Sequence, residues 1–121
     1  MAIRIPVIDQ PDAQSTIKRG TWTGLLNTDT GDLFQFPDWA DRCIQVFGTF
    51  GAGGTILIEG SNDGVNWGTL NDTNGVALSL TAASLRQMSE APLFIRPRVS
   101  AGDGTTSLTA TVVCRRLYQF L

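Results

Sequence analysis

Apolar and polar residues alternate with a period of two along much of the chain. In the run that starts at Cys43, the apolar Ile44 and Val46 alternate with Cys43 and Gln45. In residues 108–115, apolar residues alternate with a set that is rich in threonine. Successive side chains of a β-strand point to opposite faces of the sheet, so this period indicates strands with one buried face. We therefore expect β-sheets whose inner faces are apolar.

Short strand-like runs follow one another at regular intervals. Eight strands are predicted, at residues 21–27, 32–36, 42–50, 55–61, 67–70, 76–81, 94–100 and 106–116. The segments between them contain Asn-Gly, Asp-Gly and Gly-Gly pairs, which reach positive φ at little cost and are typical of tight hairpins. We predict an all-β fold, an antiparallel β-sandwich or jelly-roll-like domain in which most strands pair with their neighbours in sequence.

The first twenty residues differ from the rest. Ile3, Ile5 and Val7 belong to an apolar stretch that is followed by polar residues 9–16. Pro6 and Pro11 cannot donate to a sheet ladder, so the segment is expected to be an extended arm or an edge strand. We predict an N-terminal arm over residues 1–19, packed on something such as another subunit, and a single β-sandwich domain over residues 20–121.

Residues 81–89 form the one stretch whose pattern permits a helical turn, at residues 82–88, and Pro92 ends it soon after. A short helix and a loop that crosses between two sheets fit this pattern equally well.

Composition narrows the classes of partner. The 121 residues have room for one hydrophobic core; 42% are apolar and only 17% are charged, against about 25% in an ordinary globular domain. A surface this neutral is easily buried against a partner. The formal net charge of −2 provides no field for a phosphate backbone or an anionic membrane, so we expect no direct nucleic acid or membrane partner. Without a signal-peptide pattern or a long apolar run, we expect a cytosolic protein.

Cys43 and Cys114 are the only cysteines, and each lies in an apolar strand-like run. In a cytosolic chain we expect two reduced core residues, although a bridge is sterically possible if their strands are adjacent.

Candidate catalytic groups are sparse. The chain has no histidine, which excludes histidine triads, cysteine–histidine dyads and the commonest metal ligand. Turn preference explains most acidic residues, and this small chain offers little room for the deep cleft of a glycosidase. Residues 27–32 match a calcium loop poorly, and the glycines of residues 48–54 lead into a strand, whereas a phosphate loop leads into a helix. We expect no enzyme activity, no metal and no cofactor.

Two groups of side chains leave alternatives open. Trp22, Trp39 and Trp67 are either packing residues or platforms on which sugars stack, and packing is the commoner role of tryptophan in a β-sandwich. Arg96 and Arg98 lie two apart on one strand face, where they are either solvated or part of an interface.

Four segments resemble small structural proteins of tailed bacteriophages. They are residues 56–67 (Ile-Leu-Ile-Glu-Gly-Ser-Asn-Asp-Gly-Val-Asn-Trp), 70–72, 90–98 and 102–116, and the similarity spans residues 42–116. The chain is similar to head decoration, or cement, proteins built on β-sandwich or jelly-roll folds. The hairpin Ser-Asn-Asp-Gly-Val-Asn-Trp is also similar to that of discoidin-like jelly rolls, which bind carbohydrates and lipids.

The resemblance implies a virion protein on the capsid exterior, assembled in the host cytoplasm as a dimer or trimer, that bridges subunits of the major capsid protein. Many modest contacts suffice for such a role. We place these contacts at Ile3, Ile5, Val7, Arg96, Arg98, Tyr118 and Phe120, and we assign turn or structural roles to Asn62, Asp63, Gly64 and Trp67. The alternatives are a carbohydrate-binding module of a phage fibre or baseplate, and a tail-completion or tail-tube subunit.

Overall fold

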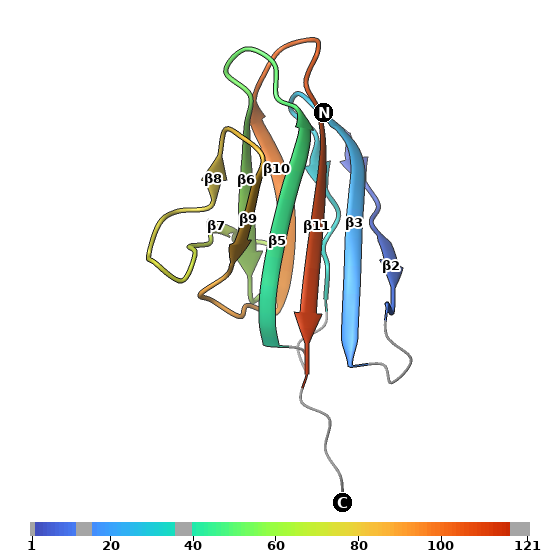
Figure 1. The fold of residues 1–121 in the computed structure, drawn as a ribbon, viewed down its shortest axis with the longest axis vertical. Coiled ribbons are helices and arrows are strands. Elements are labelled where there is room, and N and C mark those ends of the chain that lie inside the picture. The colour runs from blue at the N-terminus through green and yellow to red at the C-terminus, as the bar shows by residue number, and fades with distance from the viewer. Residues whose placement is uncertain (1, 12–15, 36–39, 117–121) are drawn as a thin grey trace, which may run out of the picture.

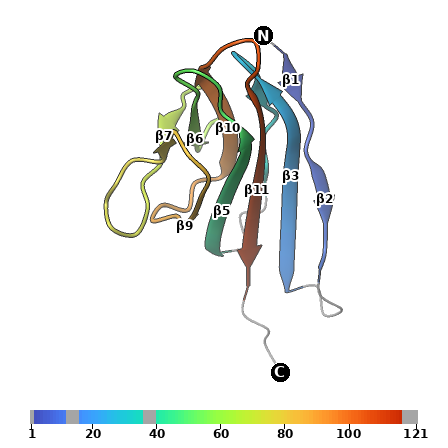
Figure 2. The ribbon, with the colours of Figure 1, turned by 45° about the horizontal axis from the view of Figure 1, so that its top comes forward.

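Two β-sheets packed face to face make up the structure, a computed structural model that describes residues 2–11, 16–35 and 40–116 (Figures 1 and 2). Within these residues there is no helix. The strands are β1 (Ile3–Arg4), β2 (Val7–Asp9), β3 (Ile17–Leu26), β4 (Thr30–Gly31), β5 (Ala40–Thr49), β6 (Thr55–Ser61), β7 (Gly68–Thr69), β8 (Ser79–Leu80), β9 (Ser84–Gln87), β10 (Phe94–Ala101) and β11 (Ser107–Arg115). The predicted all-β sandwich is confirmed.

The sheets have similar centres and different edges. Sheet A has the order β1-β4-β10-β6-β7, with β8 also paired to β6, and sheet B has the order β2-β3-β11-β5-β9. All pairs are antiparallel except β1 with β4. The long strands β10 and β6, and β3, β11 and β5, form the middle of each sheet and give it a rigid centre.

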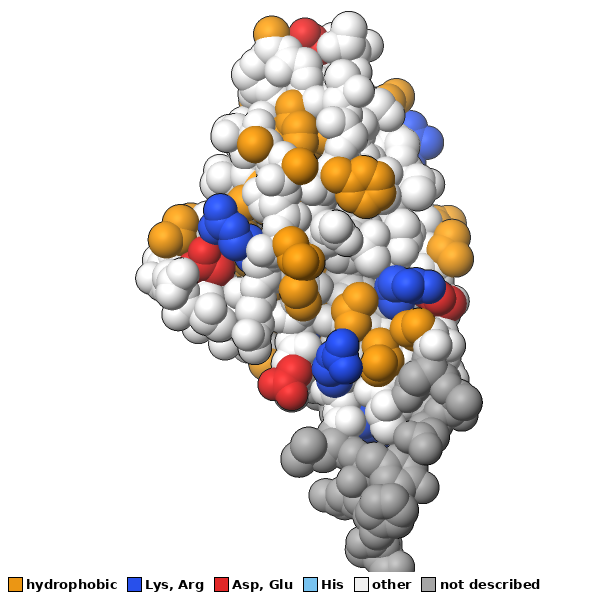
Figure 3. Space-filling model, in the orientation of Figure 1, with side chains coloured by type: hydrophobic (Ala, Val, Ile, Leu, Met, Phe, Trp, Pro, Cys, Tyr) orange, Lys and Arg blue, Asp and Glu red, His pale blue; other side chains and the backbone are white. Residues whose placement is uncertain are grey.

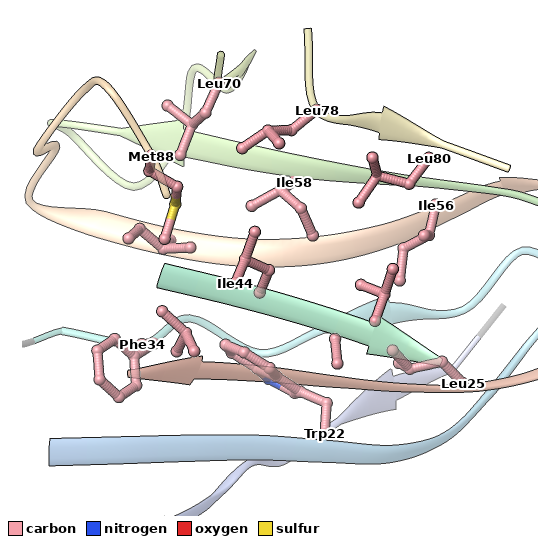
Figure 4. Close-up of a cluster of buried hydrophobic side chains, with 14 of the residues drawn as sticks. Trp22, Leu25, Phe34, Ile44, Ile56, Ile58, Leu70, Leu78, Leu80 and Met88 are labelled. Carbon is pink, nitrogen blue, oxygen red and sulfur yellow. The ribbon is translucent and has the colours of Figure 1, made fainter. Parts of the chain in front are cut away.

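The core lies between the two sheets (Figure 4). Sheet B contributes the inward side chains of its long strands, including Ile44 and Trp22, which face Ile58 of sheet A. The alternation predicted along β5 and β11 is confirmed on these inner faces. Gly20 of β3 makes room for this packing, because a Cβ at this position would lie 2.6 Å from the ring of Phe34.

Most consecutive strands lie in opposite sheets, which corrects the prediction that sequence neighbours pair. Among the described strands only β2 with β3 and β6 with β7 are both consecutive and paired. The glycine-rich segment 50–54 is a crossing from sheet B to sheet A, where a hairpin was expected. A neighbouring crossing at residues 102–106 packs beside it, with the Ala52 N–H donating to the Asp103 carboxylate at 2.9 Å.

Residues 84–87 form strand β9 at the edge of sheet B, which excludes the helical turn, one of the two alternatives for residues 81–89. The chain crosses from β8 of sheet A to β9 of sheet B before residue 84, and the rest of the stretch is a strand and not a loop. Ser84 pairs with Val46 and Gln87 with Cys43. The edge of β5 offers unpaired backbone groups, and pairing with them outweighs the weak helical pattern.

Two further predictions of strand position need correction. The strand predicted at residues 32–36 is not found in residues 32–35: β4 ends at Gly31, and Phe34 makes only an isolated bridge with Ile95. The strand predicted at residues 76–81 is reduced to β8.

Cys43 and Cys114 are free thiols on adjacent strands. Cys43 pairs with Val113, so the pleat directs Cys43 away from the core and buries Cys114 within it. The two sulfur atoms lie on opposite faces of sheet B and are therefore kept apart. Burial raises the pKa of the Cys114 thiol to about 11.

Candidate functional site

A row of side chains crosses the whole outer face of sheet B. Thr111 of β11 lies opposite Thr21 of β3 and Gln45 of β5, and the row is extended by Val7 of β2 and Leu85 of β9 at the two edges. A second pair on this face, Thr109 with Phe47, lies further along β11 and β5. We call this surface the threonine face, formed by Val7, Thr21, Gln45, Phe47, Leu85, Thr109 and Thr111.

The threonine face combines exposed apolar groups with uncharged polar ones. Val7, Phe47 and Leu85 are 67%, 46% and 65% exposed. Figure 3 shows this side of the molecule: apolar and uncharged polar atoms fill its middle, and charged groups lie toward its sides and lower end. One of the charged groups is the pair of Arg19 with Asp9, joined by an Nε–Oδ1 hydrogen bond of 3.0 Å. A partner can cover the middle of this face without desolvating a lone charge.

An open depression of about 580 Å³ lies on the same face. Its lining includes Val7, Thr21, Gln45 and Thr111 of the threonine face, and the Asp9–Arg19 pair borders it. Threonine hydroxyls both donate and accept hydrogen bonds, so the depression suits protein side chains of mixed polarity. Its lining residues include no pair of side chains arranged for nucleophilic or acid–base catalysis.

The β1–β2 segment, residues 2–9, joins the edges of both sheets. β1 pairs with β4 in sheet A, and β2 pairs with β3 in sheet B. Both are edge strands, as the two prolines predicted. β3 begins at Ile17, so the boundary proposed between residues 19 and 20 falls inside a strand.

Three side chains of the β1–β2 segment expose apolar surface: Ile3 by 66%, Ile5 by 79% and Val7 by 67%. Val7 belongs to the threonine face, and Ile3 lies opposite Thr30 on the outer face of sheet A. The segment therefore presents apolar groups at the border of both outer faces.

A single buried carboxylate holds the start of this segment. Asp29, in the turn after β3, accepts hydrogen bonds from Ala2 N (3.0 Å), Arg4 Nε (2.9 Å) and Leu26 N (2.9 Å). Burial acts to raise the pKa of the Asp29 carboxyl, but the hydrogen bonds from Leu26, Arg4 and Ala2 outweigh burial and hold this pKa below its usual range. Asp29 is thereby kept charged and bound to its three donors.

The outer face of sheet A carries a buried acid between two arginines. Glu59 of β6 is only 6% exposed, and its Oε1 and Oε2 accept hydrogen bonds from Arg96 Nε (3.0 Å) and Arg98 Nε (3.1 Å) of β10. The Arg96 guanidinium also lies over the Trp67 ring, 4.0 Å from its centroid. We call Arg96 and Arg98 the arginine pair. With Glu59 included, the cluster carries a net charge of +1.

The turn between β6 and β7 is held by its own side chains. Asp63 accepts hydrogen bonds from the backbone N–H groups of Val65 and Asn66, both at 2.8 Å, and from the Asn66 amide and the Ser61 hydroxyl. These bonds, those from Asn66 foremost, lower the pKa of Asp63. Gly64 has a φ of 76°, in the region that favours glycine.

Asn62, the other residue with a predicted turn role, accepts a hydrogen bond from Leu93 N at 3.0 Å. The bond links this turn to the segment before β10.

The tryptophans differ in their access to ligands. Trp22 is fully buried, its Nε1 donates to the Asp32 carbonyl at 2.8 Å and its ring meets Phe34 edge-on, so it is a core residue and the sugar-platform alternative fails for it. Trp67 is half-buried with Arg96 over one face of its ring. Trp39 lies outside the described residues.

A polar depression of about 460 Å³ lies beside the Trp67 turn. Its polar lining residues are Ser61, Asn62, Asn66, Thr69 and Glu90. The Glu90 carboxylate is already engaged by Asn71, which donates from its backbone N–H at 2.8 Å and from its amide at 2.7 Å.

Metal-binding clusters and membrane-spanning helices were sought in the described part of the chain. No three His, Cys, Asp or Glu side chains in residues 2–11, 16–35 and 40–116 come together in a way that suits a metal ion. Over the same ranges there is no helix of the length and apolarity that crossing a membrane requires.

The predicted contact residues are distributed over both sheets. The structure brings Ile3 and Arg98 into one row across β1, β4 and β10, and it places Arg96 beside Arg98 on the same face. Val7 lies on the opposite sheet. Tyr118 and Phe120 lie outside the described residues.

Phe47, Leu85 and Glu59 are among the residues of these surfaces that were not predicted. The alternation in β5 places Phe47 on the polar face, and an aromatic residue on a polar face is a signal of an exposed contact. Leu85 and Glu59 depend on strand pairings between distant segments, which alternation does not specify.

Comparison with known proteins identifies the fold. No family model matches the sequence, and no curated protein is significantly similar to it. Among solved structures, the chain is similar to the SPBc2 prophage-derived protein YomS, with a TM-score of 0.60 and 10% identity over 81% of this chain and 93% of YomS. A cysteine peptidase from Thevetia peruviana latex, Peruvianin-I, has a TM-score of 0.40 and 15% identity over 83% of this chain and 49% of the peptidase. The likeness to YomS shows a shared sandwich fold.

Proposed function

We propose that this chain is a non-enzymatic structural protein of a tailed-phage virion, a capsid decoration or cement protein that binds the major capsid protein. The observation that carries the proposal is the threonine face, which is uncharged in its middle and exposes Val7, Phe47 and Leu85. Exposed apolar side chains on a neutral sheet face are typical of a surface that is covered by protein.

Two further observations support a phage origin. The sequence resembles decoration proteins over residues 42–116, and the fold is shared with YomS, which is prophage-derived.

The non-enzymatic part of the proposal rests on the acidic groups. The sequence has no histidine, and Asp29, Asp63, Asp72 and Asp103 each accept several hydrogen bonds within the chain. Carboxylates held in this way are poor general acids, because their pKa values are lowered. Decoration requires adhesion and no chemistry.

Bridging requires contacts on more than one side of the protein. The threonine face, the exposed Ile3 and Ile5, and the arginine pair provide them on both sheets. Several modest contacts to one lattice raise the effective concentration of each. A dimer or trimer on the capsid exterior, assembled in the host cytoplasm, would multiply this effect.

Co-sedimentation with expanded, undecorated phage heads tests the proposal. We expect saturable binding at a fixed ratio to the major capsid protein. The double variant Phe47→Ser, Leu85→Ser removes two exposed apolar groups from the threonine face, and we expect it to weaken binding by about tenfold or more. Val65→Ser is the matched control, because Val65 is 78% exposed in the β6–β7 turn, away from this face.

Absence of binding by the folded wild-type protein would contradict the proposal. Equal loss in the Val65→Ser control would show that exposed apolar area alone, and not the threonine face, causes adhesion. Rings or tubes of the isolated protein under the electron microscope would instead favour a tail-tube or tail-completion subunit.

One observation favours a second function, a carbohydrate-binding module of a phage fibre or baseplate. The polar depression of about 460 Å³ beside Trp67 is lined by hydroxyl and amide groups, which bind sugar hydroxyls. Saturable quenching of tryptophan fluorescence by small oligosaccharides would support this function, and a flat titration would count against it.

A further inference from the structure

The arginine pair has hydrogen-bonding capacity that the chain itself leaves unused. Each guanidinium carries five N–H donors, and among the described residues the Glu59 carboxylate accepts only from the Nε of Arg96 and the Nε of Arg98. In the described part of the chain, the Nη groups of both arginines have no hydrogen-bond partner. Their side chains are 25% and 38% exposed, which leaves part of each arginine accessible to a ligand.

Glu59 fixes the direction of these free donors. Its side chain is 92% buried, and its carboxylate contacts the Nε edge of both guanidinium groups. The Trp67 ring packs against the Arg96 guanidinium, whose Cζ lies 4.0 Å from the ring centroid. An arginine that is held at one edge presents its remaining edge in a defined orientation, and pre-orientation lowers the entropy lost on binding.

The charge of the cluster favours an anion. Two guanidinium groups and one carboxylate leave a net charge of +1 on the outer face of sheet A. Arg96 and Arg98 are two positions apart on one strand, so their Cα atoms are roughly 6.5–7 Å apart. An extended peptide with acidic side chains at positions i and i+2 has the same spacing, and carboxylates pair with guanidinium forks through two parallel hydrogen bonds.

We propose that the arginine pair is a docking site for an extended acidic segment of a partner protein, with carboxylates two residues apart, and that Glu59 is its positioning residue. This site rests on the proposed function in one respect only, the identification of the partner as a virion protein. A protein carboxylate fits better than a nucleic acid, because the whole chain has a net charge of −2 and offers no extended basic track to a phosphate backbone.

Peptide titration of the full chain tests the site without any capsid, so its failure is separate from failure of the head-binding experiment. The probes are Thr-Glu-Thr-Glu-Thr and Thr-Glu-Glu-Thr-Thr, both blocked at their ends, followed by NMR of the arginine Nε–H and tryptophan Nε1–H signals. We expect the alternating peptide to bind more tightly and to shift the Arg96, Arg98 and Trp67 signals. Equal affinity for both peptides would overturn the assigned spacing.

Variants separate a built site from simple positive charge. We expect Arg98→Gln to weaken binding about fivefold, and Arg115→Gln, the same charge change on the other sheet, to leave it unchanged. Glu59→Gln raises the net charge of the cluster, so simple attraction predicts tighter binding, whereas loss of orientation predicts weaker binding. We expect weaker binding; equal or tighter binding would overturn the positioning role of Glu59.

A second variant keeps the test decisive if Glu59→Gln disturbs sheet A. Arg96→Lys, Arg98→Lys retains both charges and removes the planar forks, and we expect it to weaken binding about as much as Arg98→Gln. Unchanged affinity in the lysine variant would overturn fork recognition. Competition by inorganic phosphate or by a DNA duplex at equal charge concentration would overturn the choice of a protein carboxylate.

Discussion

Asp29 shows how one residue determines the position of a whole segment. Its carboxylate contacts Ala2 and Arg4 at the start of the chain and Leu26 at the end of β3, and it is only 4% exposed. Three donors would lose their partner if this acid were removed. The three hydrogen bonds are partly shielded from water and the Asp29 side chain is buried, so Asp29 contributes more than a surface ion pair would.

Replacement of Asp29 by asparagine tests this role. Asparagine has the same size but no charge, and its amide NH2 group would face N–H donors where Asp29 has a carboxylate oxygen that accepts from them. We expect Asp29→Asn to lower the free energy of unfolding by about 1–3 kcal/mol, measured by urea denaturation. Asp32→Asn is the control, since Asp32 is exposed and, among the described residues, its carboxylate accepts only from Leu33 N, and we expect a change below about 0.5 kcal/mol. Similar losses of stability in both variants would contradict this role of Asp29.

The alternation of apolar and polar residues predicted which face of a strand each side chain occupies better than it predicted which side chains contact one another. The buried faces of β5 and β11 and the shared face of Arg96 and Arg98 follow from spacing within one strand. Glu59 was not predicted as the partner of the arginine pair, because it reaches Arg96 only through pairing of β6 with β10, 37 residues apart in sequence. Local patterns specify the face of a side chain, and long-range pairing specifies its neighbours.

Elements were predictable in type and much less so in connection. The turn pairs Asn-Gly, Asp-Gly and Gly-Gly allow positive φ, and both hairpins and crossings between sheets require it. Gly51 has a φ of 74° and lies in a crossing, whereas Gly64 has a φ of 76° and lies in the hairpin between β6 and β7. The sequence therefore marks where a strand ends without marking which sheet the next strand joins.

The β1–β2 segment is an element whose removal separates adhesion from folding. It adds one edge strand to each sheet, and the core residues between the sheets come from other strands, apart from the partial cover that Ile8 gives to Gly20. We expect deletion of residues 1–12 to leave a folded sandwich with a lower melting temperature and to weaken binding to phage heads, because Ile3, Ile5 and Val7 are lost.

Two measurements check the deletion. Far-ultraviolet circular dichroism and a thermal melt report folding, and occupancy of expanded heads reports adhesion. A matched control, Ile3→Ser with Ile5→Ser in the full-length chain, keeps both edge strands and removes only exposed apolar groups. Unchanged head occupancy in the truncated protein would contradict a role for this segment in assembly.

At the scale of the whole molecule, the two outer faces differ in chemistry. The threonine face offers apolar and hydroxyl groups, and the opposite face offers a fixed pair of guanidinium groups. A sandwich is rigid across its thickness, because the core between the sheets is closely packed. Two partners bound to opposite faces would therefore be held at a fixed distance, as bridging requires.

Acid stability is the property in which these local arrangements act together. Six carboxyl groups that accept hydrogen bonds in the fold have lowered pKa values: Asp9, Asp29, Asp63, Asp72, Glu90 and Asp103. The hydroxyl of Thr105 and the N–H groups of Ala52 and Thr105 hold the pKa of Asp103 at about 2. In the unfolded chain these groups titrate near pH 4.

A group whose pKa is lower in the folded state stabilises the fold above its unfolded pKa, and this contribution is lost as the pH falls toward the folded value. We therefore expect the melting temperature to fall steeply between pH 4 and pH 2. It should change little between pH 5.5 and pH 7, because the chain has no histidine. Asp103→Asn should melt lower than wild type at pH 7 and lose less between pH 4 and pH 2, since one titrating group is gone. Calorimetry at pH 7, 5.5, 4, 3 and 2 checks both slopes. A constant melting temperature down to pH 2 would show that these carboxylates do not stabilise the fold. Identical slopes for the two proteins would show that Asp103 does not.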